Sequence, residues 1–421
     1  MEKYFIQVGA GRDWLDPYAS IAKSTHYKTV LLETAEYLDL RRTMSTVSFN
    51  YEIIINHDDS PEKIAELLLE KFGNNIALVL AGFEIYNERA FAIAASVGSF
   101  PTDVNTQFVC PDKGKQRELL SSSVSSIKQP NYFHVSSLTE LANISDQLTF
   151  PVVLKPTNAG GGLGVHLIAD RNHFESATEH FKQLRNYGGN AFTGFIVEDF
   201  VDGQELSLQG ICLEKSAEVL SVATKTVLKQ TDSLGVSGFR ECGHVVSTVH
   251  PDIALFKRYA QELCDIFKYQ RGAFHIDLMK KDDKYYFIEM GFRFSGMGLE
   301  KLVSDFYHSS WTQMAWLSSL GMKVNIEKKA AQHAKARLTI RDPQVLHRAK
   351  KLCIDNSHLN LTLNKHKATP NDDATLRSDQ MRHGGVLGVL SFDTAQHQQA
   401  QKILEHCCFN HQHGVITECA E

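Results

Sequence analysis

The chain has 421 residues, 43% of them hydrophobic, so it can bury a large core without disulfides or structural metals. Lys and Arg total 44 against 49 Asp and Glu, which gives a formal charge of -5. This balance argues against a nucleic-acid-binding protein, which would carry a basic surface, and against an acidic disordered tail.

The eight Cys residues are scattered and form no C-x-x-C pair, which in a chain of this size predicts free thiols in a reducing compartment. The opening residues, MEKYFIQVGAGRDW, have too short an apolar run for a secretory signal. No run of about 18 apolar residues occurs, so we expect no membrane-spanning helix. These features together predict a cytoplasmic protein.

Residues 1–108 alternate short apolar runs, such as KYFIQV, KTVLLE, YEIII and IALVLA, with polar stretches of helical length. Strands separated by helices predict crossover connections and a parallel sheet, as in a Rossmann-like α/β domain. The turn Gly9-Ala10-Gly11 suggests dinucleotide binding, but Arg12 follows where further glycine would be needed. The alternative is a tight strand-to-helix turn.

Residues 109–328 contain closely spaced strand-like runs, namely PVVLKP, GVHLI, GFIVEDF, ELSLQGICL and VLSVAT. The segment FHIDLMKKDDKYYFIEM predicts a β-hairpin, because two alternating strands flank residues 280–284. In residues 329–421 we expect an α+β domain, with strands at KARLTI and GGVLGVLSF, a polar loop over 365–373 and a helix from Thr394 to His406.

Lys155 ends an apolar strand and is followed by a glycine-rich loop over residues 158–165. A polyphosphate needs both features, because an ammonium attracts its oxygens and flexible glycines let backbone N–H groups close over them. The pattern differs from a Walker motif, since no Lys-Ser or Lys-Thr follows the glycines. The alternative is a glycine-rich hairpin beside a solvated lysine.

Asp277 and Glu289 fall on the two strands of the predicted hairpin, where they could face each other. Two opposed carboxylates repel unless a cation lies between them, and Mg²⁺ suits this pair because it takes few protein ligands and keeps phosphate or water oxygens. Arg293 follows in a glycine-punctuated loop and can reach a phosphate or a carboxylate. The alternative is an exposed pair of surface acids.

In chain order, these residues resemble the ATP-grasp superfamily, and the resemblance covers residues 1 to about 330. It implies a pre-ATP-grasp domain, an ATP-grasp core with a lid at about 135–200, and a C-terminal capping domain. The motifs that carry it are Asp112-Lys113, Lys155, Gly160, Gly161, Gly162, Gly164, the run from Glu198 to Glu205, Asp277, Glu289 and Arg293.

The resemblance also implies roles for these residues. Lys113 and Lys155 would contact phosphates under a lid formed by the glycine loop, while Asp277 and Glu289 would hold the metal. The hinge residues Glu198, Phe200 and Val201 would bind the adenine. Glu205 would bind the ribose hydroxyls. The alternatives are that Glu198 and Glu205 are solvated strand ends and that Lys113 is an exposed helix residue.

One residue departs from the family pattern, because Gly291 stands where an Asn metal ligand is expected. This departure puts the number of bound metal ions in doubt. Glu241 and His244 resemble the substrate-binding Glu and His of the bacterial L-amino acid ligases, in which the Glu receives an amino group and the counterpart of Arg293 steadies an acyl-phosphate. The alternative for His244 is a structural histidine.

We therefore expect an ATP-dependent ligase that joins a carboxylate, such as an amino acid, to an amine, with ATP and Mg²⁺ or Mn²⁺ as cofactors. Its catalytic residues would be Arg293, Lys155, Glu241 and His244. Small molecules are the expected partners, nucleic acid and membrane are not, and a homodimer is an option. Other ATP-grasp chemistry, or a catalytically weak nucleotide-binding regulator, remains as an alternative. A metal site in the terminal run from His406 to His413 is not favoured, since adjacent cysteines suit one tetrahedral ion poorly.

Overall fold

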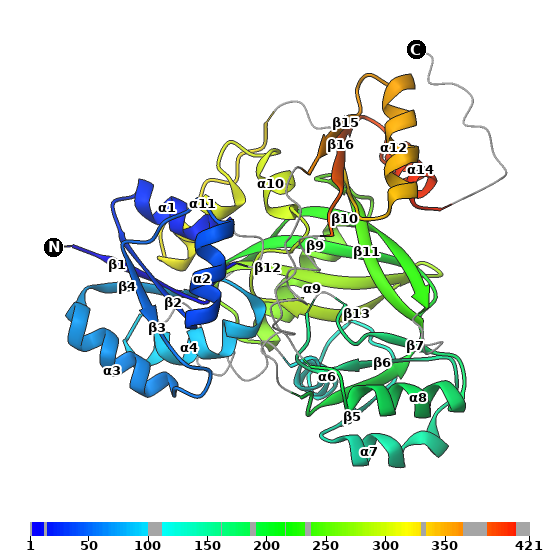
Figure 1. Cartoon of the computed structure of the whole chain (residues 1–421), viewed down its shortest axis with the longest axis horizontal. Helices are drawn as coiled ribbons and strands as arrows, with labels where there is room; N and C mark the ends of the chain where they lie inside the picture. The colour runs from blue at the N-terminus through cyan, green and yellow to red at the C-terminus, as the bar shows by residue number, and fades with distance from the viewer. Residues whose placement is uncertain are drawn as a thin grey trace.

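The structure is a computed structural model that describes residues 2–11, 15–99, 112–160, 162–185, 191–214, 216–231, 237–329, 334–364 and 385–409. Figure 1 shows an N-terminal α/β unit at the left and a large curved sheet at the centre. A smaller unit with helices α7 and α8 lies below that sheet, and the C-terminal segment lies above it.

The N-terminal unit is built on a four-stranded sheet in the order β3-β2-β1-β4, in which every neighbouring pair is parallel. This confirms the crossover topology predicted from the alternating sequence. The strands are β1 (Tyr4–Val8), β2 (Lys28–Glu33), β3 (Tyr51–Ile54) and β4 (Ile76–Ala81). The helices are α1 (Pro17–Ser24), α2 (Ala35–Met44), α3 (Pro61–Phe72), α4 (Asn87–Ser96) and the short η1 (Gly73–Asn75) and η2 (Glu84–Tyr86).

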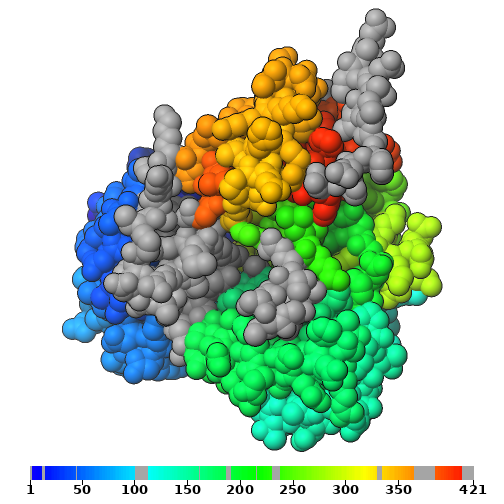
Figure 2. Space-filling model, turned by 45° about the vertical axis from the view of Figure 1, so that its right-hand side comes forward, coloured from blue at the N-terminus to red at the C-terminus, as the bar shows by residue number. Residues whose placement is uncertain are grey.

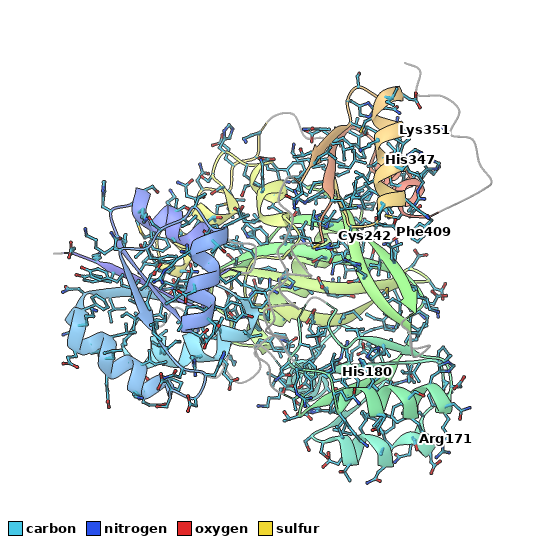
Figure 3. The ribbon with its side chains drawn as sticks, in the orientation of Figure 1. Arg171, His180, Cys242, His347, Lys351 and Phe409 are labelled. Carbon is cyan, nitrogen blue, oxygen red and sulfur yellow. The ribbon has the colours of Figure 1, made fainter. Side chains whose placement is uncertain are left out.

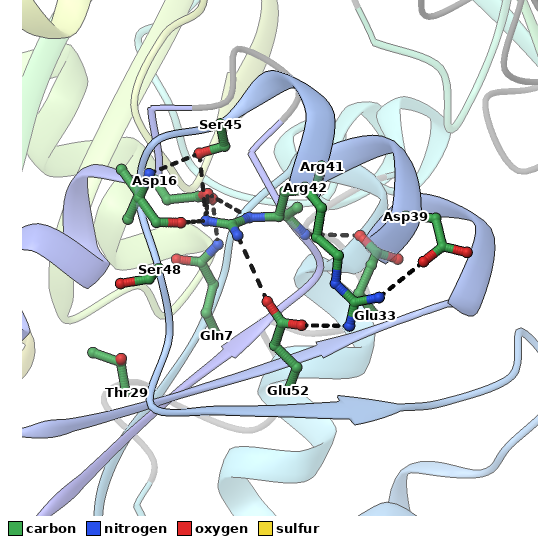
Figure 4. Close-up of polar contacts among 12 residues, drawn as sticks. Gln7, Asp16, Thr29, Glu33, Asp39, Arg41, Arg42, Ser45, Ser48 and Glu52 are labelled. Carbon is green, nitrogen blue, oxygen red and sulfur yellow. Dashed lines mark hydrogen bonds and ion pairs between the residues drawn. The ribbon is translucent and has the colours of Figure 1, made fainter.

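The glycine turn after β1 is occupied by carboxylates (Figure 4). Glu33 accepts a hydrogen bond from the Ala10 N–H at 2.8 Å, and Asp16 accepts one from the Gly11 N–H at 2.8 Å. Asp16 is buried and also pairs with Arg41 at 3.0 Å. A pyrophosphate would need these same N–H groups and would meet two negative charges, so the turn does not fit a dinucleotide.

The central sheet has twelve strands, nine of which run in the order β13-β12-β9-β10-β11-β7-β6-β8-β5. Its strands are β5 (Tyr132–Val135), β6 (Val152–Pro156), β7 (His166–Ile168), β8 (Phe195–Asp199), β9 (Gln204–Leu213), β10 (Ser216–Thr231), β11 (Ser237–Ser247), β12 (Arg271–Lys281) and β13 (Lys284–Gly291). The accompanying helices are α6 (Lys113–Ser121), α7 (Leu138–Asn143), η3 (Ser145–Gln147), α8 (Arg171–Phe181) and α9 (Ile253–Ile266).

Strands β12 and β13 form the predicted hairpin. Its two turn residues, Asp282 and Asp283, have φ values of 47° and 56°. A two-residue turn with both residues in the left-handed region matches the twist of paired strands, and Asp tolerates that conformation. The hairpin prediction is therefore confirmed, with a tighter turn than residues 280–284.

The N-terminal unit and the central sheet share a hydrophobic core. Helices α10 (Leu299–Ser304) and α11 (Trp311–Ser319) supply Trp311 and Trp316, both almost fully buried. The Trp316 ring packs edge-on against Phe5 of β1, with centroids 5.1 Å apart. This packing fixes the N-terminal unit beside the sheet that carries the candidate site.

The C-terminal segment extends the central sheet, because β14 (Ala334–Ile340) pairs with β11. Strand β16 (Gly388–Thr394) then pairs with β14 and with β15 (Asn360–Leu363). Helices α12 (Pro343–Asp355) and α14 (His397–Cys408) cover these strands, and the segment lies against the central sheet in Figure 2. The helix predicted from Thr394 thus begins at His397, and the predicted loop over 365–373 lies outside the described residues. No helix in the described ranges is long and apolar enough to cross a membrane.

Candidate functional site

A buried carboxylate between two cations links β6, β8 and α6. Glu198 Oε1 lies 2.5 Å from Lys155 Nζ, and its Oε2 lies 2.6 Å from Arg117 Nη2. Burial alone would raise the pKa of Glu198, but the two cations lower it, whereas burial lowers the pKa of Lys155. Glu198 is therefore not a solvated strand end. Arg117, which lies one helical turn after Lys113, was not identified from the sequence.

Lys113 ties helix α6 to the glycine loop and to the hairpin. Its Nζ donates to the Ala159 carbonyl at 2.6 Å and lies 2.8 Å from Glu289 Oε2. The alternative of an exposed helix lysine is thus wrong. In the loop that follows Ala159, Gly162 and Gly164 have φ values of 78° and 71°, a region that L side chains rarely enter.

The glycines of this loop differ in how much space surrounds them. A Cβ at Gly160 would meet only Glu84, at 4.0 Å, so its surroundings are open. A Cβ on Gly164 would lie 2.9 Å from Phe181, so packing adds a second reason for glycine there. Gly161 lies outside the described residues.

Lys225 of β10 was not identified from the sequence, although it lies at the centre of three carboxylates. Its Nζ is 2.7 Å from both Glu205 Oε1 and Asp277 Oδ2, and 3.6 Å from Glu241 Oε2. Burial would lower the pKa of Lys225, but the carboxylates raise it well above its ordinary value. Burial, followed by repulsion from neighbouring acids, raises the pKa of Glu205. Glu205 is therefore an ion-paired residue and not a solvated strand end.

Asp277 and Glu289 lie directly opposite each other in the β12–β13 ladder, as predicted. Ser207 donates to Asp277 at 2.6 Å, while Glu289 holds Lys113. Burial would raise the pKa of Glu289, but Lys113 lowers it to about 2, so the carboxylate is ready to bind a cation.

The donor set fits magnesium. Within the described ranges, no group of three or more His, Cys, Asp or Glu residues is placed to hold a metal ion. Mg²⁺ needs no such cage, because it binds one or two carboxylates and completes its shell with phosphate and water oxygens. Asp277 and Glu289 could hold it in this way.

Gly291 has a packing reason that the sequence did not reveal. It lies opposite His275 in the hairpin, and a Cβ at position 291 would be 2.1 Å from the His275 Cε1 atom. The buried His275 ring thus fills the space where an Asn side chain would begin, and its Nδ1 lies 3.2 Å from the Arg293 carbonyl. An asparagine at position 291 would require the His275 ring to move.

Glu241 and His244 share one face of β11 because the strand contains a bulge. Thr226 of β10 pairs with Gly243, and the next residue pairs with Glu241, so Cys242 is left over. His244 Nδ1 then lies 3.0 Å from Glu241 Oε1. Burial would raise the pKa of Glu241, but Lys225 and His244 lower it to about 2.

Arg293 contacts a residue of the N-terminal unit. Its Nε makes an ion pair with Glu84 Oε2, and Asn87 donates to the other Glu84 oxygen at 3.3 Å. Glu84 was missed because it lies 209 positions away, in the N-terminal unit. The N-terminal unit therefore places a charged side chain in the candidate site.

Two of the predicted hinge residues, Phe200 and Val201, lie directly after β8. The Phe200 ring stacks on Phe239 of β11, with centroids 6.0 Å apart and an interplanar angle of 18°. Val201 is half-buried at the start of the connection to β9. Their nucleoside-binding role, like the roles of the other site residues, stays a prediction.

Comparisons with known proteins agree with this architecture. Residues 148–301 match the family described as the ATP-grasp domain. A formate-dependent phosphoribosylglycinamide formyltransferase from Prochlorococcus marinus (strain MIT 9312) is 27% identical over 100 residues, which are 24% of this chain. That stretch spans only 25% of the relative's length.

Two solved structures cover nearly the whole chain. An L-amino acid ligase from Bacillus licheniformis gives a TM-score of 0.69 at 15% identity, over 97% of each chain. A carboxyaminoimidazole ribonucleotide synthase from Aspergillus clavatus, complexed with ATP, gives 0.67 at 14% identity, also over 97% of each chain. At such identity the likeness is one of fold.

Residues 148–301 therefore match the ATP-grasp domain family. Over its full length it shares the fold of an L-amino acid ligase and of a carboxyaminoimidazole ribonucleotide synthase. This confirms the resemblance drawn from the sequence motifs.

Proposed function

We propose that the chain is an ATP-dependent ligase that joins a carboxylate, most simply that of an amino acid, to an amine through an acyl-phosphate. The observation that carries the proposal is the pairing of two opposed hairpin carboxylates with lysines from separate elements. Lys113 of α6 binds Glu289, and Lys225 of β10 binds Asp277. Lys155 lies near enough to contribute to the lowered pKa of Glu289.

The lysines and the carboxylates would both serve a bound nucleotide. Phosphate oxygens would replace the carboxylates as partners of Lys113, Lys155 and Lys225, and the carboxylates of Asp277 and Glu289 released in this way would hold Mg²⁺. Each buried charge keeps a partner in this exchange, which avoids the large cost of an uncompensated ion. Bound Mg²⁺ would neutralise charge on the transferring phosphoryl group.

Arg293 would bind the acid substrate. Its guanidinium pairs with Glu84 and donates to the Phe294 carbonyl at 2.5 Å. A substrate carboxylate or its acyl-phosphate would compete with Glu84 for this fork of donors. Glu241 and His244 lie on β11, the strand next to the one that carries Lys225, and would face the amine, a role suggested by their resemblance to ligase residues.

The glycine loop would exclude water from the acyl-phosphate. Lys113 holds the loop at Ala159 while it contacts Glu289, so the loop and the proposed metal-binding carboxylate are joined through one side chain. Closure over the nucleotide would protect the intermediate until the amine attacks.

The test is ADP release by a Glu289→Gln variant in the presence of amino acid pairs, bicarbonate or no acceptor. We expect amino-acid-stimulated release by the unaltered chain and a fall of about 100-fold or more in the variant, since a metal ion supplies several kcal/mol of charge stabilisation. Asp283→Asn is the matched control, because this acid lies in the exposed turn of the same hairpin and Asn tolerates its positive φ.

The same assay separates the alternatives. Bicarbonate-dependent ADP release would make the chain a carboxylase, and binding of ATP without turnover would make it a regulator. Gly291 had favoured a regulator, but His275 accounts for the glycine by packing alone. ADP release that survives Glu289→Gln would refute the metal assignment.

A further inference from the structure

Two cysteines from distant parts of the chain meet beside the candidate site. Cys242 Sγ lies 3.4 Å from Cys408 Sγ, although 166 positions separate them. Cys242 is on β11, and Cys408 is the last residue of α14. Figure 3 shows Cys242 next to Phe409, the residue that follows α14.

The bulge in β11 is what turns Cys242 toward α14. As the extra residue of the bulge, Cys242 has no direct partner in β10, and its side chain packs in the core formed by β14, β16 and α14. Its neighbours Glu241 and His244 contact each other instead. One local irregularity thus positions both the thiol and the candidate substrate residues.

The two thiols differ in exposure and in the direction of their pKa shifts. A hydrogen bond from Cys242 lowers the pKa of Cys408, and Arg348 lowers it further. Arg348 is held in place because its Nε donates to the Cys407 carbonyl at 2.7 Å. The hydrogen bond with Cys408, followed by burial, raises the pKa of Cys242. Cys408 is partly exposed, so it is the thiol that an oxidant reaches first.

We propose that Cys242 and Cys408 form a reversible disulfide that ties the end of α14 to the β11 bulge. The oxidant is a peroxide. The Cys408 thiolate attacks a peroxide oxygen, which breaks the O–O bond and gives a sulfenic acid and, after protonation, water. The Cys242 sulfur then attacks the Cys408 sulfur, and its proton leaves with the hydroxyl group as a second water.

The bond would act on the candidate site through Glu241. Because a disulfide has a sulfur separation of about 2.05 Å, the two sulfurs must approach by about 1.3 Å. Cys242 directly follows Glu241, so this movement disturbs the contacts of Glu241 with Lys225 and His244. The effect on turnover rests on the proposed ligase function, whereas formation of the bond does not.

The experiment treats the full-length chain with hydrogen peroxide and then blocks the remaining thiols. We expect the loss of two thiols and a cross-linked peptide pair containing residues 242 and 408, about 2 Da lighter than the two thiol peptides together. Dithiothreitol should separate the peptides. Cys408→Ser should abolish the cross-link, and Cys353→Ser, which removes another partly exposed thiol, should leave it intact.

Two results would overturn the proposal. One is oxidation that leaves Cys242 reduced, with Cys408 bonded to Cys407 or carried on to a sulfinic acid. The other is no thiol loss at peroxide concentrations that oxidise Cys353. Turnover is read separately, as the ratio of ADP release before and after reduction. If the cross-link forms and that ratio does not change, the disulfide proposal stands and its proposed effect on the candidate site is refuted.

Discussion

Replacing Lys225 with Met is the sharpest test of the electrostatics of the site. Met keeps much of the apolar stem and removes the charge. Glu205, Asp277 and Glu241 would then face one another without the cation that they share. We expect the variant to fold with a reduced free energy of unfolding, because carboxylates left buried and unpaired are costly.

The structure indicates how much unfolding free energy the Lys225→Met variant should lose. The pKa of Glu241 falls from 4.5 to about 2, with Lys225 as the strongest cause that lowers it. At about 1.4 kcal/mol for each pKa unit, the attraction of its partners exceeds the cost of burial by about 3 kcal/mol. Removing one member of a buried pair costs about 3 to 5 kcal/mol, which agrees. We therefore expect a loss of roughly 3 kcal/mol at pH 8.

The contribution of Glu241 to the pH dependence of stability should change sign. In the unaltered chain, the lowered pKa of Glu241 gives stability that is present above pH 4.5 and lost as the pH falls toward 2. In the variant, repulsion and burial raise the carboxylate pKa values above those of the unfolded chain, so the folded state binds more protons. Its stability should then increase as the pH falls from 8 to 5.

Urea unfolding at pH 8 and pH 5 measures both effects. Lys257→Met is the matched control, since Lys257 pairs with Glu218 on the exposed surface at 3.0 Å and should contribute under about 1 kcal/mol. A Lys225→Met loss no larger than the control, or a loss equal at both pH values, would refute the reasoning.

Two further substitutions test particular contacts. Gly291→Asn should lower the free energy of unfolding by about 1 to 3 kcal/mol, because its Cβ would overlap His275. In a His275→Ala background the same change should cost at least about 1 kcal/mol less, and additive losses in urea unfolding would contradict the contact. Glu84→Gln should lower the KM for the acid substrate up to about fivefold, because it removes the competitor for Arg293. A rise in that KM would instead make Glu84 a substrate ligand.

The sequence predicted those parts of the fold whose signals are local. Alternation of apolar and polar runs was enough for the parallel N-terminal sheet, and the β12–β13 hairpin followed from two strands around a polar turn. Strand β11 was not predicted, because its text, SGFRECGHVVS, mixes glycines and charges. Strand β11 forms because it pairs with β10 along almost the whole length of β11. Such pairing is a long-range effect.

The candidate site was predicted where known motifs mark it and missed where only tertiary structure does. Lys155, Asp277 and Glu289 stand in recognisable patterns. Lys225 is one of two lysines in β10, a long strand that mixes apolar and polar residues, and Glu84 belongs to the N-terminal unit. Neither has a neighbour in the sequence that shows its partner. Their roles depend on strand register and domain packing, which spacing alone does not determine.

Strand register also explains why the pairing of Asp277 with Glu289 could not be derived from the geometry of the hairpin turn. Counting back from the hairpin turn, Lys281 pairs with Lys284 and Leu278 with Phe287, a register that would place Glu289 opposite Ile276. A bulge shifts the ladder by one residue, so that Asp277 faces Glu289 instead. Because side chains alternate between the faces of a strand, without this shift the two carboxylates would point to opposite faces.

A second bulge, at Cys242, does the same for Glu241 and His244, which are an odd number of residues apart and would otherwise diverge. Both pairs of candidate site residues thus depend on one extra residue in a strand. Bulges of this kind occur often beside active sites, because they redirect side chains without breaking the sheet. Irregular positions in the strands therefore place the side chains of this candidate site. Periodicity in the sequence cannot reveal those positions.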